Sequence, residues 1–389
     1  MTGGAHRVQG SLVAVVVGAG WAGEGHTLAM RHCGVQVAAL CARNAEVVRA
    51  VADRLAVAEA STDWRATLRA VRPDIVCLAT PAALRGEVVA EAAALGAHVL
   101  CDKPLALDAG EAARLFRLVH EAGVRHAYAT TFRYDPSVAW LAELVRSGRI
   151  GRLREIAAST RRQLAPGIWP WSWLLDPAQG GGWLHNGLTH VLGVLTRVCG
   201  TPPVRAVGDA RLVPVQAAVV PGLHDFRRFQ SLRLTAAEAH GLQRRDGEIE
   251  RSYRALLVFG IGDAAVRASV TYQADIAVPW PHNGLRLFGS EATLVAEETG
   301  PGTYAVALRR PGEGAAEPLP VPPRLAEQVA SDPATFVQSR WNALARDFVA
   351  DIRGEAGAPY PTFLDGWRDQ VVIEAVRRGR EWTDLPAGP

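Results

Sequence analysis

The stretch SLVAVVVGAGWAG, residues 11–23, decides the fold of the first part of this chain. It predicts a buried parallel strand, because a strand covered on both faces is a continuous apolar run, and this run leads directly into the pattern G-x-G-x-x-G. The first glycine permits a tight turn, the second lets backbone approach a pyrophosphate, and the third lets a helix pack closely on the strand. The pyrophosphate would lie at the helix N-terminus, where free N–H groups favour an anion. We therefore predict a dinucleotide site that includes Gly18, Gly20, Trp21, Ala22 and Gly23.

Strand-like runs and helical patterns alternate through the first third of the chain. Strands are predicted at 35–41, 74–79, 98–101 and 125–130, with helical patterns between them. This βαβ alternation predicts an α/β domain with a doubly wound parallel sheet, which is a Rossmann fold. We place this cofactor-binding domain at residues 1–131.

The pattern changes after residue 131. Few helices separate the longer strand-like runs that follow, at 152–163, 204–212, 255–260, 265–272, 284–288 and 293–297. Such a series predicts an α+β domain on a mostly antiparallel open sheet. We place this second domain, which would bind substrate, at 132–389. Because an exposed sheet face favours self-association, we also expect a homodimer or homotetramer.

Composition narrows the class of protein. The 389 residues are 49% apolar and 21% charged, the balance of a globular protein. The arginines are spread along the chain, so we expect no nucleic-acid partner. No stretch is long and apolar enough to span a bilayer, and residues 11–17 lead directly into the glycine motif without a signal peptide, which predicts a cytoplasmic protein without a membrane partner. The five cysteines have no C-x-x-C spacing and are expected as reduced core residues, with no metal site.

The end of the second predicted strand selects between the two nicotinamide cofactors. An acidic residue at this place holds the ribose 2′-OH of NAD, whereas an arginine accepts the 2′-phosphate of NADP. The sequence reads Cys41-Ala42-Arg43-Asn44, without a carboxylate. Since a phosphate matches the planar donor fork of arginine, Ala42 and Arg43 predict NADP(H) as the preferred cofactor, with NAD(H) as the alternative.

The fourth predicted strand ends in HVLCDKP, residues 98–104. In an open parallel sheet, ligands bind at the carboxyl ends of the strands. Lys103, stiffened by the proline after it, would place a proton donor there. A surface lysine in a turn is the alternative, and the spacing alone leaves both interpretations open.

Several motifs together resemble one family. The glycine motif at 18–23, Thr80-Pro81 and GAHVLCDKPL at 96–105 are similar to the glucose–fructose oxidoreductase / inositol dehydrogenase (Gfo/Idh/MocA) family, which typically has Glu-Lys-Pro where this chain has Asp-Lys-Pro. The resemblance covers nearly the whole chain, since it continues with FRYDP at 132–136, GRIG at 148–151, GGG at 180–182 and PTFLDG at 361–366.

This resemblance implies a fold and an activity. The fold would be a Rossmann domain followed by an α/β domain with an open sheet. The activity would be hydride exchange between a nicotinamide and a carbon bearing oxygen, usually on a sugar or cyclitol. Lys103 takes the place of the family's catalytic lysine. We add to the expected cofactor site Thr80, Pro81, Asp102, Lys103 and Arg133.

The segment HNGLTHVLG, residues 185–193, departs from the family's pattern. His190 matches the family's histidine, whereas Asn186, Leu188 and Gly193 replace an aspartate, a glycine and a second aspartate. If Asn186 and His190 lie on one helix, their four-residue spacing puts them on one face. An asparagine can position a partner there, but it holds no charge.

These departures leave the proton-transfer pair open. Arg85 also stands where the family often has histidine. Proton transfer would rest on Lys103 with His190, or on Lys103 with another group: His185, Tyr134 or Tyr128.

Four tryptophans surround this segment: Trp169, Trp171, Trp173 and Trp183. Flat aromatic faces suit the C–H faces of a sugar, but packing in a core or an interface is the commoner use of tryptophan. The segment begins just after the last of the four. We assign to the substrate site Lys103, Trp183, His185, Asn186 and His190.

The sequence as a whole predicts an NADP(H)-dependent oxidoreductase that acts on a sugar, keto-sugar or cyclitol, with Lys103 as the acid/base. The expected partner is therefore a small, carbohydrate-like molecule. One alternative is a reductase of a ketone or imine in specialised metabolism. The other is a cofactor-binding protein without catalysis, since a fold alone does not fix a function.

Overall fold

The computed structural model describes residues 11–164, 166–223, 226–274, 276, 283–300, 302–327 and 333–389. Its first sheet has six parallel strands in the order β3-β2-β1-β4-β5-β6. The strands are β1 (Val13–Val17), β2 (Gln36–Cys41), β3 (Glu59–Ser61), β4 (Ile75–Leu78), β5 (His98–Asp102) and β6 (His126–Ala129). The strand order runs outward from β1 on both sides, first to β2 and β3 and then to β4, β5 and β6. The predicted doubly wound sheet is therefore confirmed.

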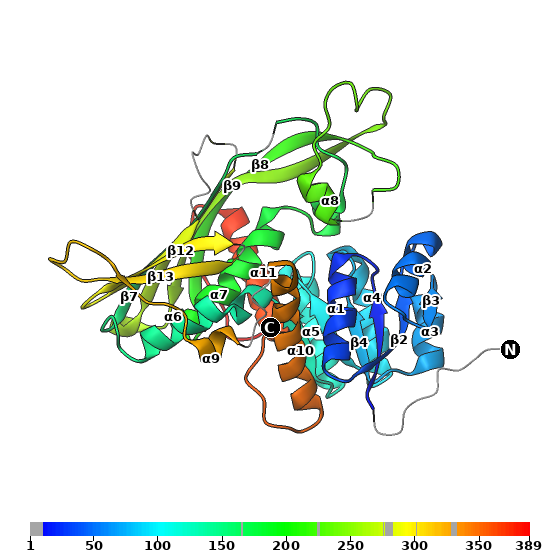
Figure 1. The fold of residues 1–389 in the computed structure, drawn as a ribbon, viewed down its shortest axis with the longest axis horizontal. Coiled ribbons are helices and arrows are strands. Elements are labelled where there is room, and N and C mark those ends of the chain that lie inside the picture. The colour runs from blue at the N-terminus through cyan, green and yellow to red at the C-terminus, as the bar shows by residue number, and fades with distance from the viewer. Residues whose placement is uncertain are drawn as a thin grey trace.

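Helices cover both faces of this sheet. One face packs against α1 (Trp21–His32), α2 (Ala45–Arg54) and α10 (Pro333–Ile352). The other face packs against α3 (Trp64–Val71), α4 (Arg85–Ala94), α5 (Ala109–Glu121) and α11 (Phe363–Arg378). The last two helices of the chain therefore return to the first sheet, and Figure 1 shows α10 beside α1. The division at residue 131 stays a prediction.

The second sheet has nine strands in the order β14-β13-β12-β11-β7-β10-β9-β8-β15. Only its β7–β10 pair is parallel, so the predicted mostly antiparallel sheet is confirmed. The strands are β7 (Leu153–Arg162), β8 (Pro203–Ala218), β9 (Arg244–Phe259), β10 (Val266–Ala274), β11 (Gly284–Gly289), β12 (Thr293–Gly300), β13 (Thr303–Arg309), β14 (Glu317–Pro318) and β15 (Thr383–Asp384).

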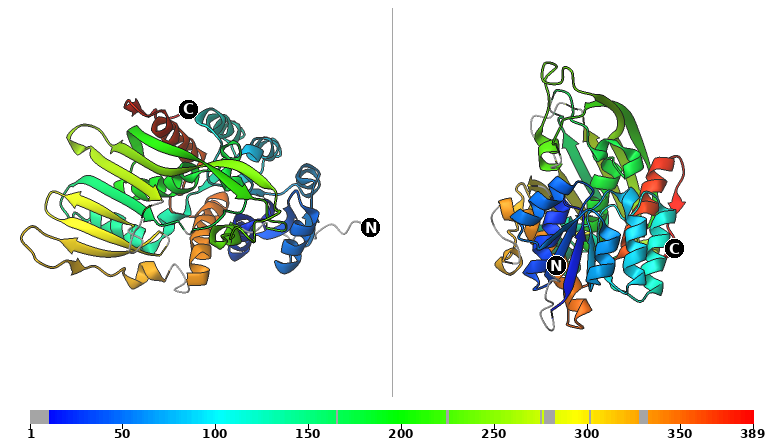
Figure 2. Two further views of the ribbon diagram at one scale, coloured as in Figure 1. Left: turned by 90° about the horizontal axis from the view of Figure 1, so that it is seen from above. Right: turned by 90° about the vertical axis from the view of Figure 1, so that its right-hand side faces the viewer.

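In the part of the chain that the structure describes, helices cover one face of this second sheet. Side chains of α6 (Pro136–Arg146), α7 (Thr189–Cys199) and α11 form a single apolar core with that face, and Figure 2 shows the helices against the sheet. On the other face, Leu256 is 48% exposed and Phe288 36%. The predicted open face is therefore present.

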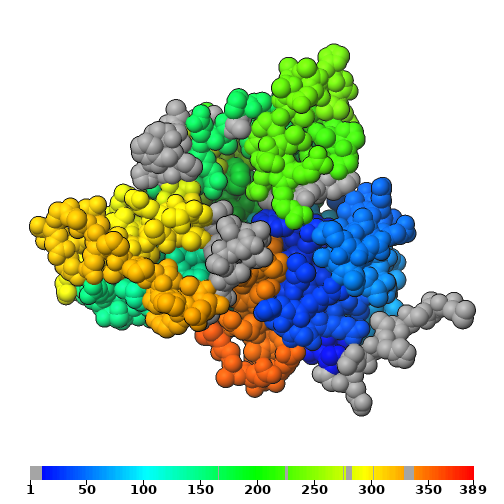
Figure 3. All heavy atoms as spheres, viewed as in Figure 1, coloured from blue at the N-terminus to red at the C-terminus, as the bar shows by residue number. Residues whose placement is uncertain are grey.

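The hairpin of β8 and β9 is longer than the sequence predicted, with 16 residues in each strand. The outer half of β9, residues 244–251, is mostly charged and so lacks the apolar run that marks its inner half. Beyond the strands, α8 (Phe226–Ser231) reaches the first domain, where the guanidinium of Arg227 lies 3.4 Å from the carboxylate of Glu24 on α1. Figure 3 shows this green lobe directly above the blue atoms of the first domain. None of the described helices is long and apolar enough to cross a membrane.

Candidate active site

The predicted dinucleotide loop joins β1 to α1. Gly18 has a φ of +121°, and a Cβ there would lie 2.5 Å from the carbonyl oxygen of Ala79. A Cβ on Gly23 would lie 1.8 Å from the carbonyl oxygen of Gly18, whereas a Cβ on Gly20 would meet nothing within 4 Å. Two glycines are thus required by packing, and the middle one borders open space.

This loop fits a dinucleotide. No side chain caps the N-terminus of α1, so its free N–H groups are available to an anion. Thr80 lies in the loop that follows β4, the strand beside β1. Its hydroxyl oxygen is buried without a hydrogen-bond partner among the described residues. Trp21 and Ala22 form the first turn of α1, and Trp21 packs edge-on against Trp341, with ring centroids 5.3 Å apart.

The loop after β2 carries the two residues that the sequence assigned to the cofactor, Ala42 and Arg43. Ala42 is half-buried and Arg43 is exposed. Asn44 caps α2, because its side-chain oxygen accepts the N–H groups of Glu46 and Val47, each at 3.0 Å. The asparagine therefore serves the helix, and the guanidinium of Arg43 is left to the solvent side of the strand end.

Lys103 follows β5 and contacts the second domain. Its Nζ donates a hydrogen bond of 2.8 Å to Oδ1 of Asn186. The Nδ2 of Asn186 in turn donates to the carbonyl oxygen of Gly182 at 2.8 Å, which fixes the orientation of the amide. The structure thus brings together two of the predicted residues that lie 83 positions apart in the sequence.

Asn186 lies in a π-helical turn, η5 (Leu184–Leu188), that leads into α7. Gly182 precedes the turn with a φ of +91°, and a Cβ there would lie 2.3 Å from a carboxylate oxygen of Glu250. That carboxylate accepts the N–H of Trp183 at 2.5 Å and lies 3.5 Å from the guanidinium of Arg377. The turn is therefore held by β9 and α11, and Asn186 and His190 are separated by a π turn rather than a single regular α-helix.

His190 lies in the first turn of α7 and stacks on Phe132, with ring centroids 3.9 Å apart and an interplanar angle of 9°. Its Nδ1 is buried without a hydrogen-bond partner in the described part of the chain. Burial, and then the charge of Lys103, hold the pKa of His190 well below its usual value. The imidazole is therefore neutral at physiological pH.

Phe132 is itself fixed by a buried ion pair. The guanidinium of Arg340, on α10, lies 4.8 Å from the centre of the Phe132 ring. The same guanidinium donates to the Asp135 carboxylate at 2.7 Å, and both side chains are fully buried. In the sequence, Phe132 was recognised only as part of a family motif. Nothing in the residues around Arg340 predicted its contact with Phe132 or Asp135.

Lys103 lies among charged and polar groups from several elements. Asp102 precedes it, and Nε2 of His26 on α1 lies 3.1 Å from the Asp102 carboxylate. Burial alone would raise the pKa of Asp102, but the His26 hydrogen bond and the charges of His26, Lys103 and Arg85 outweigh it, so this pKa lies below its usual value. Burial lowers the pKa of Lys103, Asp102 opposes that shift, and Arg85 adds to it.

Among the other predicted groups, His185 is packed into the protein. Its two ring nitrogens each lie 3.2 Å from an acceptor, the carbonyl oxygen of Gly181 and Oε1 of Gln370. Burial is the main cause that lowers the pKa of His185 to about 4. Tyr128 and Tyr134 are also enclosed, and burial raises the pKa of both hydroxyls.

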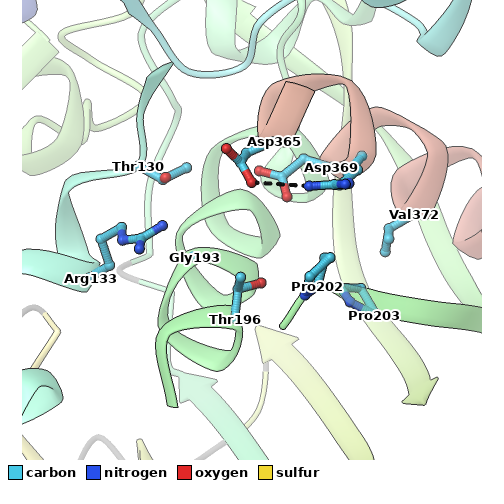
Figure 4. A pocket seen from close by; sticks show the side chains of 10 residues that line it. Thr130, Arg133, Gly193, Thr196, Pro202, Pro203, Asp365, Asp369 and Val372 are labelled. Atoms are coloured by element: carbon cyan, nitrogen blue, oxygen red, sulfur yellow. Dashed lines mark ion pairs between the residues drawn. The ribbon is translucent and has the colours of Figure 1, made fainter. Parts of the chain in front are cut away.

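Arg133 lines a small cavity. The cavity lies between the end of β6, α7 and α11, and Figure 4 shows Arg133 facing it together with Thr130, Gly193 and Asp369. The Nε of Arg133 is buried without a hydrogen-bond partner among the described residues. Gly193 keeps space open here, since a Cβ on it would lie 3.1 Å from the Cβ of Thr130.

A second, small cavity lies beside His190 and Phe132. Its wall combines apolar side chains from α7 and the second sheet with a few polar groups: Val191, Val194, Val270, Leu285, Asn283, Glu298 and Tyr304. This mixed lining is typical of small-molecule sites.

The tryptophans have different surroundings. Trp169 packs in a small core of the hairpin lobe, and the guanidinium of Arg233 lies 3.7 Å from its ring centre. Trp171 lies under Arg245 in a similar way, at 4.1 Å. Trp183, the one assigned to substrate, is half-buried against Tyr272, with ring centroids 5.7 Å apart.

Comparison with known proteins agrees with this architecture. Residues 12–130 match the family described as "Oxidoreductase family, NAD-binding Rossmann fold", and residues 138–295 match the "GFO/IDH/MocA C-terminal domain". The chain belongs to the Gfo/Idh/MocA family. The resemblance noted in the sequence is thereby confirmed.

Curated relatives in this family include several sugar dehydrogenases. Levoglucosan dehydrogenase of Pseudarthrobacter phenanthrenivorans is 28% identical over 196 residues, which are 48% of this chain and 50% of that protein. D-glucoside 3-dehydrogenase of Escherichia coli is 30% identical over 175 residues, 44% of this chain and 49% of that protein. D-xylose 1-dehydrogenase (NADP(+)) 2 of Haloferax volcanii is 30% identical over 167 residues, 43% and 50% of the two chains. The chain thus spans about half the length of the curated relatives it matches.

Solved structures of the same family share the fold over nearly the full length. Apo levoglucosan dehydrogenase superposes with a TM-score of 0.78 at 21% identity, over 97% of this chain and 99% of that one. Its complex with NADH and L-sorbose gives a TM-score of 0.77 at 20% identity, with the same coverage. At 20–21% identity, this structural similarity establishes the fold alone.

The lysine content of the sequence holds a further signal for the site. Lysine and arginine together number 42 in this chain, and Lys103 is the only lysine. Arginine does not release its proton in proteins, whereas a buried lysine does. The one place where the chain uses lysine is therefore the place where proton transfer is expected.

Proposed function

We propose that this protein is an NADP(H)-dependent oxidoreductase that transfers hydride between the nicotinamide and a hydroxyl or carbonyl carbon of a sugar, keto-sugar or cyclitol. The observation that carries the proposal is the 2.8 Å hydrogen bond from Nζ of Lys103 to Oδ1 of Asn186. It joins the carboxyl end of a Rossmann strand to the second domain, beside His190. Family membership and the sugar dehydrogenases among its relatives support the substrate class.

The residues of the chain divide the chemistry as follows. When bound, the nicotinamide supplies or accepts the hydride. Lys103 moves the proton: in oxidation its neutral amine takes the proton of the substrate hydroxyl, and in reduction its ammonium returns one to the carbonyl oxygen. Asn186 holds the amine in place through its fixed amide. His190, neutral and held flat on Phe132, offers a hydrogen bond that orients the substrate.

The loop from Gly18 to Gly23 would hold the pyrophosphate at the N-terminus of α1. Arg43, exposed at the end of β2 where no carboxylate stands, supports NADP(H) over NAD(H) through its guanidinium. We assign Thr80, Pro81, Asp102 and Arg133 to the cofactor as well. The buried, unpartnered hydroxyl of Thr80 supports its assignment.

A substrate panel tests this function. Purified protein would be mixed with NADP⁺ or NAD⁺ and with free aldoses, anhydrosugars, glucosides and cyclitols, and formation of reduced cofactor would be followed by absorbance. We expect turnover of at least one polyol or sugar, faster with NADP⁺. Tight NADPH binding with no turnover on the panel would instead favour a non-catalytic cofactor-binding protein.

A second candidate is the reductase of a more apolar ketone or imine. The apolar part of the cavity beside His190, with Val194, Val270 and Leu285, favours it. NADPH oxidation with cyclic ketones and imines that lack hydroxyl groups tests this alternative, and a higher kcat/KM for these compounds than for any keto-sugar would establish it.

We also propose that the chain forms a homodimer or homotetramer through the open face of the second sheet. The exposed Leu256 and Phe288 on that face support this. Light scattering of the purified chain would give the mass, and a Leu256→Arg variant should yield the monomer.

A further inference from the structure

Arg85 is a buried cation that binds only neutral groups. It opens α4, just after the loop that follows β4, and it is 3% exposed. Its Nε and Nη2 donate to the carbonyl oxygen of Thr80 at 3.0 and 2.6 Å, and its Nη2 lies 3.5 Å from the carbonyl oxygen of Lys103. Its Nη1 donates to the carbonyl oxygens of Asp102 and Pro104. In the described part of the chain, no carboxylate lies within ion-pair distance of this guanidinium.

These contacts tie two loops together at the carboxyl end of the first sheet. One loop follows β4 and the other follows β5, and Arg85 crosses between them. Five donors in a rigid fork suit this task, which a lysine could not perform. Because a guanidinium keeps its proton at all physiological pH values, the arrangement also leaves a fixed positive charge beside Lys103.

Among the described residues, no carboxylate forms an ion pair with Lys103. Its Nζ meets the neutral amide of Asn186. The carboxylate of Asp102 lies next to it in the chain but accepts from His26 on α1. The remaining groups that act on the amine are His185 in the π turn and His190 on α7, both of which are neutral near pH 7.

Two of these features act in the same direction. Burial disfavours the charged form of an amine and is the largest cause here; the charge of Arg85 acts in the same direction, but less than Asp102 opposes it. An amide at position 186 adds no negative charge to oppose them. Only Asp102 acts against the shift, and the net effect lowers the pKa of Lys103.

We propose that Arg85 is a positioning residue that clamps the Thr80 and Asp102–Pro104 loops and so holds Lys103 in its buried place against Asn186. This inference rests on the proposed function for its use: the neutral Nζ accepts the proton of the substrate hydroxyl. In that step the O–H and C–H bonds break, the N–H and C=O bonds form, the hydride reduces the oxidised nicotinamide, and no further reactant is needed.

The presence of a single lysine makes a direct test possible. An amine-reactive acylating reagent can modify only Lys103 and the α-amino group of the chain, and peptide mass spectrometry separates the two. The rate of modification at Lys103, measured against pH without substrate or cofactor, gives the midpoint of its titration. We expect a midpoint below the ordinary value of about 10.4 for lysine.

Variants then assign the cause. In Arg85→Met, which keeps an apolar stem but ties neither loop, the amine loses part of its burial and the midpoint should rise towards the ordinary value by about one pH unit. In Asn186→Asp it should rise by about one to three units, because an opposite charge lies in contact with the amine. The matched control is Arg31→Met: Arg31 also donates to main-chain carbonyls, at Leu55 and Ala56, but on the far part of α1. It should leave the midpoint unchanged.

The outcomes separate this inference from the proposed function. A wild-type midpoint at or above 10.4, or an Arg85→Met midpoint equal to the wild type, overturns the inference even if sugars are oxidised. If Arg85→Met does not fold, Arg85→Gln, which keeps part of the donor set, takes its place in the same comparison. A lowered wild-type midpoint that rises in the variants supports the inference even if no sugar is turned over, a result that would overturn the proposed function alone. Where turnover is found, the acid limb of kcat/KM should follow the same midpoint.

Discussion

The imidazole of His190 lies flat on the ring of Phe132, with 3.9 Å between ring centroids and 9° between ring planes. Phe132 comes from the segment after the last strand of the first sheet, and His190 from the first helix after the π turn. The stack therefore ties the segment that follows the first sheet to the helix that carries His190.

Removing this stack should change the titration of His190. In the wild type burial holds the pKa of His190 well below its usual value, so its NMR signals should titrate at a lower pH than those of an exposed histidine. In Phe132→Ala, water reaches the ring and the midpoint should move towards about 6.5. The control is Phe116→Ala, which removes a stack on His120 at 5.3 Å instead. An unchanged His190 spectrum in Phe132→Ala would contradict the prediction.

Lys103→Met should slow hydride transfer strongly. Methionine keeps the apolar stem and removes the proton donor, and general acid–base catalysis contributes about 10²- to 10⁴-fold, so single-turnover NADPH oxidation should slow by about that factor. NADPH affinity, measured by fluorescence, should change little, because the glycine loop holds the pyrophosphate. The same change at His190 should cost less. A normal rate for Lys103→Met would mean that the lysine is structural or the reaction is another one.

Asn186→Ala should chiefly weaken substrate binding. The variant loses the acceptor that holds Nζ of Lys103 at 2.8 Å but retains the proton-transfer group. We expect a raised KM, with a smaller loss in kcat than in Lys103→Met. Asn186→Asp should remain active with a shifted pH–rate curve. A loss of kcat in Asn186→Ala as large as in Lys103→Met would show a direct role in turnover.

Arg43→Ala should narrow the preference for NADPH over NADH. One charge-assisted contact contributes about 1.5–3 kcal/mol, or roughly ten- to a hundred-fold in affinity. The matched control is Arg49→Ala, since Arg49 is also exposed but lies along α2 rather than at the end of β2. Fluorescence titration with both cofactors gives the ratio. Equal affinities in the unmodified protein would refute the NADP(H) assignment.

Acid should destabilise the fold through its buried histidine. The pKa of His185 is about 4 in the folded chain, mainly because of burial, against about 6.5 unfolded. Between these values the unfolded chain binds more protons, so stability is full above pH 6.5 and falls as the pH drops towards 4. Two and a half pH units correspond to about 3 kcal/mol for this group. Urea unfolding of His185→Gln at several pH values should show a shallower loss, and an identical slope would contradict this.

Local sequence determined the frame of the cofactor site. The strand, the glycine turn and the first helix follow from residues that are neighbours in the chain, because their spacing alone fixes the turn and the helix N-terminus. The same holds for Arg43 at the end of β2 and Lys103 at the end of β5, since parallel strands bring their carboxyl ends to one edge. The family, the fold class and the open second sheet were all predicted on this basis.

Only the tertiary structure decided what surrounds Lys103. Asn186 reaches it through a π turn held by Glu250 from β9, and His26 reaches Asp102 from α1 across 76 residues. The long hairpin of β8 and β9 and the return of α10 to the first sheet gave no local signal either. The physical reason is that pairing between distant segments depends on packing and loop closure, which sequence spacing does not encode. The sequence by itself thus determined where a cofactor and a lysine would stand, and the packing of the two domains decided which charges and hydrogen bonds act on that lysine.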